Sequence, residues 1–215
     1  MRESKLNILL VNASQRNQAN SALLARYIQK HTLLDKDNIT SSILDLSDYS
    51  ALLGHYGFDD EDKSQVEIEK QQVLAKLYQC DAVVFITPEW GGMIPPALVN
   101  LLLLTANGSA GGLPLGHKPA MAIGVSTSAG GSNPVTLLKA YSAKNSHLVW
   151  LPLHAIIHNV EDFLQCPWTP NEQDRLSQLQ SRVNIGIESL VIYAEQLKPV
   201  RESLVALSKT HPFGQ

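Results

Sequence analysis

Hydroxyl, amide and guanidinium groups gather directly after the first apolar segment of the chain. Residues 6–11 form an apolar run typical of a buried strand, and an amphipathic helix pattern begins at Ser21. A helix that follows a strand this closely directs unpaired N–H groups and a partial positive charge toward the end of the sheet, which favours an anion. We therefore expect a phosphate site here, with helix capping beside a surface arginine as the alternative interpretation. The candidate ligands are Ser14, Arg16, Asn20 and Ser21.

Two further loops rich in small residues follow later apolar segments, 82–87 and 120–125. Small residues let the backbone approach a ligand closely, and the carboxyl ends of parallel strands lie at one edge of a sheet. Each loop by itself is compatible with an ordinary tight turn, but three such loops at one predicted edge indicate a shared cleft. The candidates are Pro88, Glu89, Trp90, Gly91 and Gly92 in the first loop, and Ser126, Ser128 and Gly131 in the second.

Composition and missing motifs narrow the class of function. The 215-residue chain has a net charge of −3 and shows no basic stripe, which argues against a nucleic-acid partner. Its most apolar run, residues 94–106, contains two prolines and is shorter than the roughly 20 residues that a membrane span needs, so we expect no membrane partner. Neither the Gly-x-Gly-x-x-Gly pattern of dinucleotide binding nor a P-loop pattern follows the first strand.

The cysteines and histidines do not suggest a metal centre. Cys80 and Cys166 stand far apart and match no metal or redox spacing, so a reduced, cytoplasmic setting is expected. His154 and His158 are four residues apart, but His154 falls in a predicted strand, where such a pair does not share one helical face. The chain enters its first strand almost at once, and no secretory signal is expected.

Apolar runs alternate with helical patterns along the whole chain, which predicts an α/β doubly wound parallel sheet with helices on both faces. We expect one domain over residues 1–198 and a tail or short helix over 199–215. An acidic cluster at 59–62 should precede the helix that reaches Tyr78. The expected strands are 6–11, 39–46, 82–87, 120–125 and 148–157, and the other expected helices are 21–30, 95–106, 134–144 and one capped by Thr169 and ended by Pro199.

Two of the loops resemble the signature loops of the NADPH-dependent FMN reductase family of flavodoxin-like proteins. That family carries Gly-Ser-x-Arg after its first strand, and residues 13–16 read Ala-Ser-Gln-Arg. It carries Pro-Glu-Tyr-Asn-x-Ser-x-Pro-x-x-Leu-Lys-Asn after its third, and residues 88–100 read Pro-Glu-Trp-Gly-Gly-Met-Ile-Pro-Pro-Ala-Leu-Val-Asn. Residues 126–131 are similar to its Ser/Thr- and Gly-rich loop after the fourth strand. The resemblance covers roughly residues 5–160.

The resemblance implies a flavodoxin-like sheet of five strands in the order 2-1-3-4-5. It also implies an enzyme that uses FMN with NADPH or NADH to reduce flavins, quinones or similar small acceptors, with hydride transfer through flavin N5. The loop with Arg16 would then hold the FMN phosphate, and the Trp90 turn would lie beside the flavin ring. No catalytic side chain is expected, because the cofactor carries the hydride.

Other readings of the chain stay open at this stage. Gly91, Met93 and Val99 replace the Asn, Ser and Lys of the family pattern, so the alternatives are an electron carrier without NAD(P)H activity and a non-redox interaction protein. The helix over 95–106 is apolar nearly all round, which predicts a homodimer or homotetramer that buries its second face.

Overall fold

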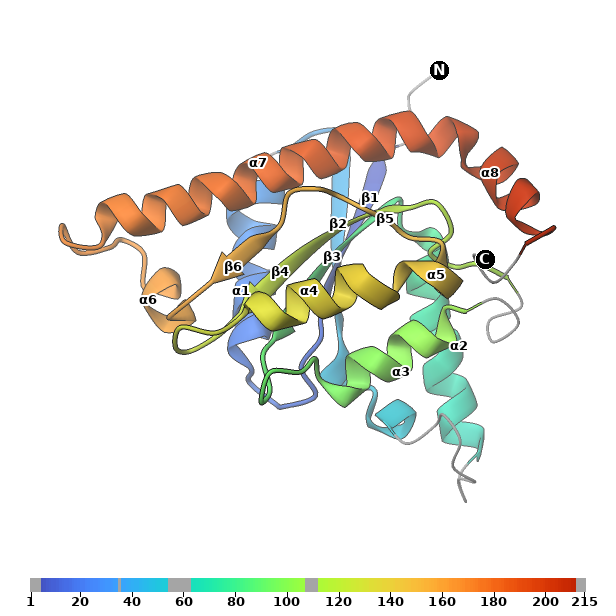
Figure 1. The fold of residues 1–215 in the computed structure, drawn as a ribbon, viewed down its shortest axis with the longest axis horizontal. Coiled ribbons are helices and arrows are strands. Elements are labelled where there is room, and N and C mark those ends of the chain that lie inside the picture. The colour runs from blue at the N-terminus through green and yellow to red at the C-terminus, as the bar shows by residue number, and fades with distance from the viewer. Residues whose placement is uncertain (1–4, 35, 54–62, 107–111, 212–215) are drawn as a thin grey trace.

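A parallel sheet separates two layers of helices in the computed structural model of the protein, which describes residues 5–34, 36–53, 63–106 and 112–211 (Figure 1). The sheet has the strand order β2-β1-β3-β4-β5. Strand β6 also pairs with β4, at residues nearer the carboxyl end of β4 than those that pair with β5. This confirms the expected doubly wound, flavodoxin-like order. The strands are β1 (Leu6–Asn12), β2 (Ile39–Asp45), β3 (Ala82–Pro88), β4 (Pro119–Val125), β5 (Val149–Trp150) and β6 (Ala155–Ile157).

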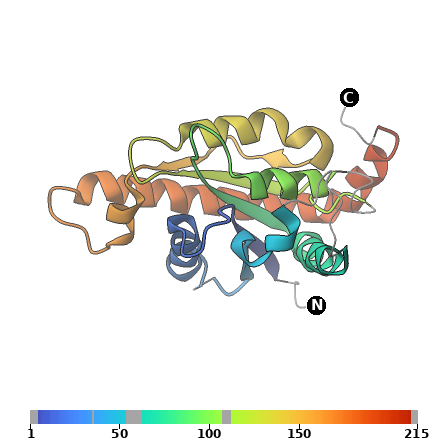
Figure 2. The same cartoon turned by 90° about the horizontal axis from the view of Figure 1, so that it is seen from below.

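Helices cover both faces of this sheet. Side chains of α1, α6 and α7 pack on one face, and side chains of α2, α3 and α4 pack on the other. Figure 2 shows the blue α1 and the yellow α4 on opposite sides of the strands. The helices are α1 (Asn20–Ile28), α2 (Lys63–Gln79), α3 (Pro96–Leu104), α4 (Ser132–Tyr141), α5 (Ala143–Ser146), α6 (Val160–Leu164), α7 (Gln173–Leu197) and α8 (Arg201–Ser208), with a π-helical turn at Gln29–Leu33 and 3-10 turns at Leu46–Asp48, Ser50–Leu53 and Lys198–Val200.

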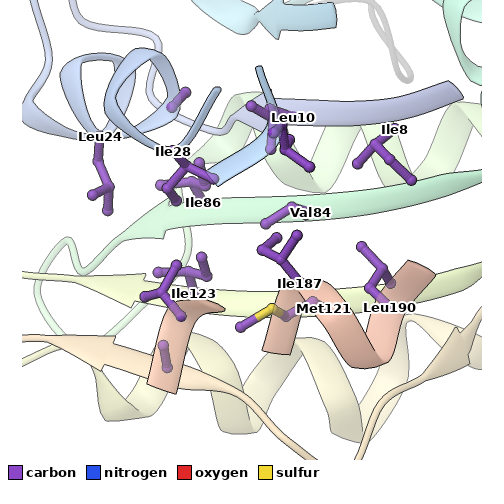
Figure 3. Close-up of a cluster of buried hydrophobic side chains, with 14 of the residues drawn as sticks. Ile8, Leu10, Leu24, Ile28, Val84, Ile86, Met121, Ile123, Ile187 and Leu190 are labelled. Atoms are coloured by element: carbon purple, nitrogen blue, oxygen red, sulfur yellow. The ribbon is translucent and has the colours of Figure 1, made fainter. Parts of the chain in front are cut away.

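The core divides according to the two-residue period of the strands. In β1, Ile8 and Leu10 face the α1 and α7 layer, whereas Leu9 and Val11 face the α2 and α3 layer. Figure 3 shows the first cluster, in which strand residues meet Ile187 and other side chains of the two covering helices. Strands buried on both faces require nearly unbroken apolar sequence, which is the pattern that predicted them.

The strand expected over residues 148–157 is wrong in one respect, because the structure divides it into β5 and β6. Pro152 stands between them, and a proline has no N–H to donate to a β-ladder. The carbonyls of Leu151 and Pro152 instead accept hydrogen bonds from Lys139 Nζ at 2.6 and 2.9 Å. The chain therefore leaves the sheet after pairing with Pro119 and Ala120 and returns to pair farther along β4.

Several helix ends also differ from expectation. Helix α7 begins at Gln173 and not next to Thr169, whose carbonyl accepts the N–H groups of Glu172 and Gln173 in a preceding turn. It ends at Leu197, before Pro199, as expected, and a short helix, α8, follows. The acidic cluster at 59–62 lies outside the described residues. No helix in the described ranges is long and apolar enough to cross a membrane.

Candidate functional site

The loop after β1 is held in place by a buried asparagine that sequence reasoning missed. Asn12 ends the strand, and its Oδ1 accepts hydrogen bonds from the Ser14 N–H at 3.2 Å and the Ser21 hydroxyl at 2.7 Å. Its Nδ2 donates to Asp45 Oδ1 at 2.7 Å. Ser14 Oγ in turn accepts the Arg16 N–H at 3.2 Å. The Ser21 hydroxyl is thus used to shape the loop.

Helix α1 starts from this loop with its positive end open. Its N-cap position is Ala19, and no side chain of the described residues caps it. The Ala19 carbonyl accepts the N–H groups of Ala22 and Leu23, and no acidic residue occupies the first turn. Asn20 Nδ2 donates to Glu161 Oε1 at 3.0 Å. The end of the helix dipole therefore faces the crevice described below without a protein carboxylate from its own first turn.

The loop after β3 is a two-residue hairpin turn. Trp90 and Met93 exchange backbone hydrogen bonds of 2.9 and 3.0 Å across Gly91 and Gly92. Both glycines have positive φ, +58° and +83°, as a type I′ turn requires. A Cβ at Gly91 would meet no described atom within 4 Å, so the backbone conformation, and not crowding, selects glycine there.

Glu89 connects this turn to the loop after β4. Its Oε2 accepts the Gly131 N–H at 2.5 Å, and its Oε1 accepts Asn133 Nδ2 at 3.3 Å. The Glu89 N–H donates to the Val125 carbonyl at 3.0 Å. The Glu89 carboxylate is therefore engaged in positioning the loop after β4.

The loop after β4 folds back over its own strand. A Cβ at Gly124 would collide with the carbonyl oxygen of Gly131, which has a φ of +110° and precedes α4. The Gly130 carbonyl lies 2.7 Å from His158 Nδ1, and Ser126 Oγ accepts the Ser128 N–H at 3.1 Å. The loop is thus pinned by β6 and its neighbours, a role for His158 that the sequence did not indicate.

The three loops meet in one crevice of about 150 Å³ at the carboxyl edge of the sheet. Of the predicted site residues, eight line it: Ser14, Arg16, Asn20, Ser21, Pro88, Glu89, Trp90 and Ser126. The structure places the other four, Gly91, Gly92, Ser128 and Gly131, in the same loops but outside that lining. The crevice is also lined by four residues that the sequence did not indicate: Ala19, Val125, Thr127 and Val160.

Arg16 contributes the positive side chain of this lining. It is exposed, and its Cζ lies 4.4 Å from the centre of the Trp90 ring. Within the described ranges no ion pair involves Arg16. Its guanidinium therefore keeps N–H donors available for an anionic ligand.

Two larger hollows, of about 590 and 480 Å³, lie at the opposite, amino edge of the sheet, beside Lys5 and beside Ser41. Ligands of doubly wound sheets bind at the carboxyl edge, where this chain gathers three loops and a helix N-terminus. We therefore assign the site to the smaller crevice. No group of three or more His, Cys, Asp or Glu among the described residues could hold a metal ion.

The model of the NADPH-dependent FMN reductase family matches residues 6–162. The chain belongs to this family. Membership makes it an FMN-dependent NAD(P)H oxidoreductase, with FMN as the flavin and NADPH or NADH as the electron donor. A search of the curated proteins finds no match.

Three solved structures share the fold at low sequence identity. The NAD(P)H:acceptor oxidoreductase FerB of Paracoccus denitrificans is 19% identical with a TM-score of 0.64, over 90% of this chain and 98% of its own. The NADH:FMN oxidoreductase EMOB is 14% identical with a TM-score of 0.60, over 90% of each chain. RosB, solved with 8-demethyl-8-formylriboflavin-5′-phosphate, is 16% identical with a TM-score of 0.64, over 96% of this chain and 87% of its own. At such identities the likeness establishes the flavodoxin-like fold.

Proposed function

We propose that this member of the reductase family holds FMN in the crevice between the loops after β1, β3 and β4, and transfers a hydride from NADPH or NADH to a small acceptor such as a flavin or a quinone. The observation that carries the proposal is the meeting of three loops at the open N-terminus of α1, beside an arginine that no described carboxylate pairs.

The donors in the crevice suit a phosphate monoester. Arg16 supplies the charge, Ser14 and Asn20 supply polar side chains, and the first turn of α1 supplies N–H groups. Ser21 lines the same end, with its hydroxyl donated to Asn12. We assign the phosphate to these residues, and we assign the flavin ring to the turn at Pro88, Glu89, Trp90, Gly91 and Gly92 with Ser126, Ser128 and Gly131 on the other side.

The size of the crevice suits a flavin that keeps part of its ring outside. Its volume of about 150 Å³ is below the roughly 300 Å³ at which ligand clefts and cavities begin, so it can hold only part of the cofactor. Bound FMN supplies hydride acceptance and donation at N5, so the chain has to bind and orient it and need not provide an acid or base. The Glu89 carboxylate, engaged with Gly131 and Asn133, fits such a positioning role.

The visible absorption spectrum tests the proposal. Purified protein, or protein given equimolar FMN, should show the flavin bands, and NADPH or NADH should bleach them without oxygen. Yellow protein that neither nucleotide bleaches would indicate an electron carrier. Colourless protein that fails to retain added FMN would indicate a non-redox interaction protein and would overturn the proposal.

We also propose that the protein forms a homodimer or homotetramer through the 95–106 helix. One side of α3 is buried by its own chain through Ala97, Leu98 and Leu101, whereas Val99 is 36% exposed and the neighbouring Met93 is 57% exposed. A second subunit would cover these apolar groups. Light scattering at micromolar concentration tests this, and a monodisperse monomer would contradict it. The cytoplasmic setting and the division at residue 198 stay predictions.

A further inference from the structure

The cation–π contact between Arg16 and Trp90 joins two parts of the site that the proposed function keeps separate. Arg16 belongs to the loop after β1, assigned to phosphate, and Trp90 belongs to the turn after β3, assigned to the flavin ring. The guanidinium carbon lies 4.4 Å from the ring centre, within the range of a cation–π interaction, and both residues line the crevice.

The backbones on either side of this contact are fixed, but no charged group of the described residues forms an ion pair with the arginine side chain. The hairpin hydrogen bonds between Trp90 and Met93 fix the backbone that carries the indole, and Ser14 Oγ accepts the Arg16 N–H. Glu89, the acidic residue of the crevice lining, directs its carboxylate to Gly131 and Asn133. Within the part of the chain that the structure describes, the aromatic ring is therefore the group that restrains the guanidinium.

A stacked guanidinium remains able to bind phosphate. Stacking uses the flat face of the group, whereas its N–H donors lie in the plane and form bidentate bonds to phosphate oxygens. A carboxylate partner would instead consume those donors. An exposed arginine also loses side-chain entropy when a ligand immobilises it, and a residue that restrains it beforehand reduces this loss.

We propose that Trp90 is a positioning residue that acts through Arg16 and favours 5′-phosphorylated flavin over riboflavin. The proposal rests on the proposed FMN site. Tryptophan offers the best face for a cation among the aromatic residues, so the Trp at this position, where the family pattern has Tyr, strengthens the restraint. Loss of the ring should therefore weaken FMN binding more than riboflavin binding.

Equilibrium titrations with FMN and with riboflavin, measured by flavin fluorescence, test this preference. Four proteins are compared: the wild type, Trp90→Leu, Arg16→Met and the double variant. Trp90→Leu should weaken FMN about two- to fivefold more than riboflavin, the effect of about 0.5–1 kcal/mol for an exposed cation–π pair. Trp90→Phe should restore part of the preference. In the Arg16→Met background, Trp90→Leu should change both affinities by the same factor.

Met93→Leu is the matched control, because it changes the other residue of the same hairpin bridge and leaves the contact between Arg16 and Trp90 in place. It should leave the ratio of the FMN and riboflavin affinities unchanged. Thermal unfolding confirms that each variant is folded. If Trp90→Leu lowers the affinity for both flavins equally in the presence of Arg16, the ring only contacts the flavin. If it raises the affinity for FMN, the ring blocks the site. Either result overturns the inference. A wild type that binds neither flavin overturns the proposed function as well, so the two failures are distinguishable.

Discussion

The two ends of the sheet use similar polar residues in opposite ways. At the carboxyl end, Arg16 is exposed and its guanidinium carbon lies over an aromatic ring. At the amino end, Arg201 is mostly buried, and its Nη1 donates to Asp81 Oδ1 at 3.1 Å. Lys198 Nζ and the Asn7 N–H also donate to Asp81, at 2.9 and 3.0 Å. The carboxyl end leaves the Arg16 guanidinium without an ion pair among the described residues, whereas the amino end pairs its cations with a carboxylate.

This difference separates binding from stabilisation. Burying a charge is costly unless it is paired, so the amino-end cluster can hold α8 and the end of α7 against the sheet because Lys198 and Arg201 both pair with Asp81. Lys118 follows the same rule, since its buried Nζ donates to the carbonyls of Leu77 and Tyr78 at the end of α2. Burial lowers the pKa of Lys118. Donors that remain in water at the carboxyl end can be given to a ligand.

The largest expected effect is the loss of the amino-end carboxylate. Asp81→Ala should lower the free energy of unfolding by about 3 kcal/mol, because it removes the carboxylate that pairs with Lys198 and Arg201. Urea denaturation measures this loss. Asp162→Ala is the control, since Asp162 faces Arg175 at 3.9 Å with both side chains more than 40% exposed, and it should cost less than about 1 kcal/mol. Equal losses of unfolding free energy in the two variants would contradict a stabilising role for the amino-end cluster.

Acid should remove the same contribution in the wild type. Burial alone would raise the pKa of Asp81, but hydrogen bonds from Lys198, the Asn7 N–H and Arg201 hold it below its ordinary value of 3.8. A carboxylate with a lowered pKa stabilises the fold fully above its unfolded-state pKa, and the contribution is lost as pH falls through the folded-state value. Unfolding free energies of the wild type and Asp81→Asn should therefore converge as pH falls below 3.8; a constant gap down to acid unfolding would contradict this.

The substitution Glu89→Gln tests the connection between the loops after β3 and β4 at the carboxyl end of the sheet. Glutamine keeps the shape but replaces a charged acceptor, so one of the bonds from Gly131 and Asn133 is weakened. We expect a loss of about 1 kcal/mol in stability and roughly fivefold weaker FMN binding. Urea denaturation and flavin titration measure the two quantities. The exposed Glu188→Gln serves as the control, and unchanged FMN affinity in Glu89→Gln would remove the positioning role.

The last prediction concerns the hairpin turn, where a change in stability is the only predicted effect. Gly91→Ala should cost about 1 kcal/mol of stability, because alanine disfavours the φ of +58°. Gly91→Asn should cost less, since asparagine tolerates this conformation and no described atom lies within 4 Å of the added Cβ. Thermal unfolding ranks the variants. Equal destabilisation by Ala and Asn would show that something other than backbone conformation selects glycine.

The order of the sheet and the meeting of three loops could be predicted because their signals are local. Unbroken apolar runs mark strands buried on both faces, and small residues after such runs mark the ligand edge. The last strand was predicted less well, since Pro152 interrupts the ladder while the apolar run continues around it. The start of α7 was also misplaced, because Thr169, Pro170 and Glu172 form a turn that satisfies the same capping pattern.

The amino-acid sequence by itself determined the alternation of strands and helices, the family, and which loops carry the groups that we propose for phosphate. Only the tertiary structure decided which polar groups form hydrogen bonds within the protein: Asn12 with Ser21, Glu89 with Gly131, and Asp81 with Arg201. The reason is that periodicity and turn chemistry act over a few residues, whereas a hydrogen bond between residues 42 or 120 positions apart exists only once the sheet has brought them together.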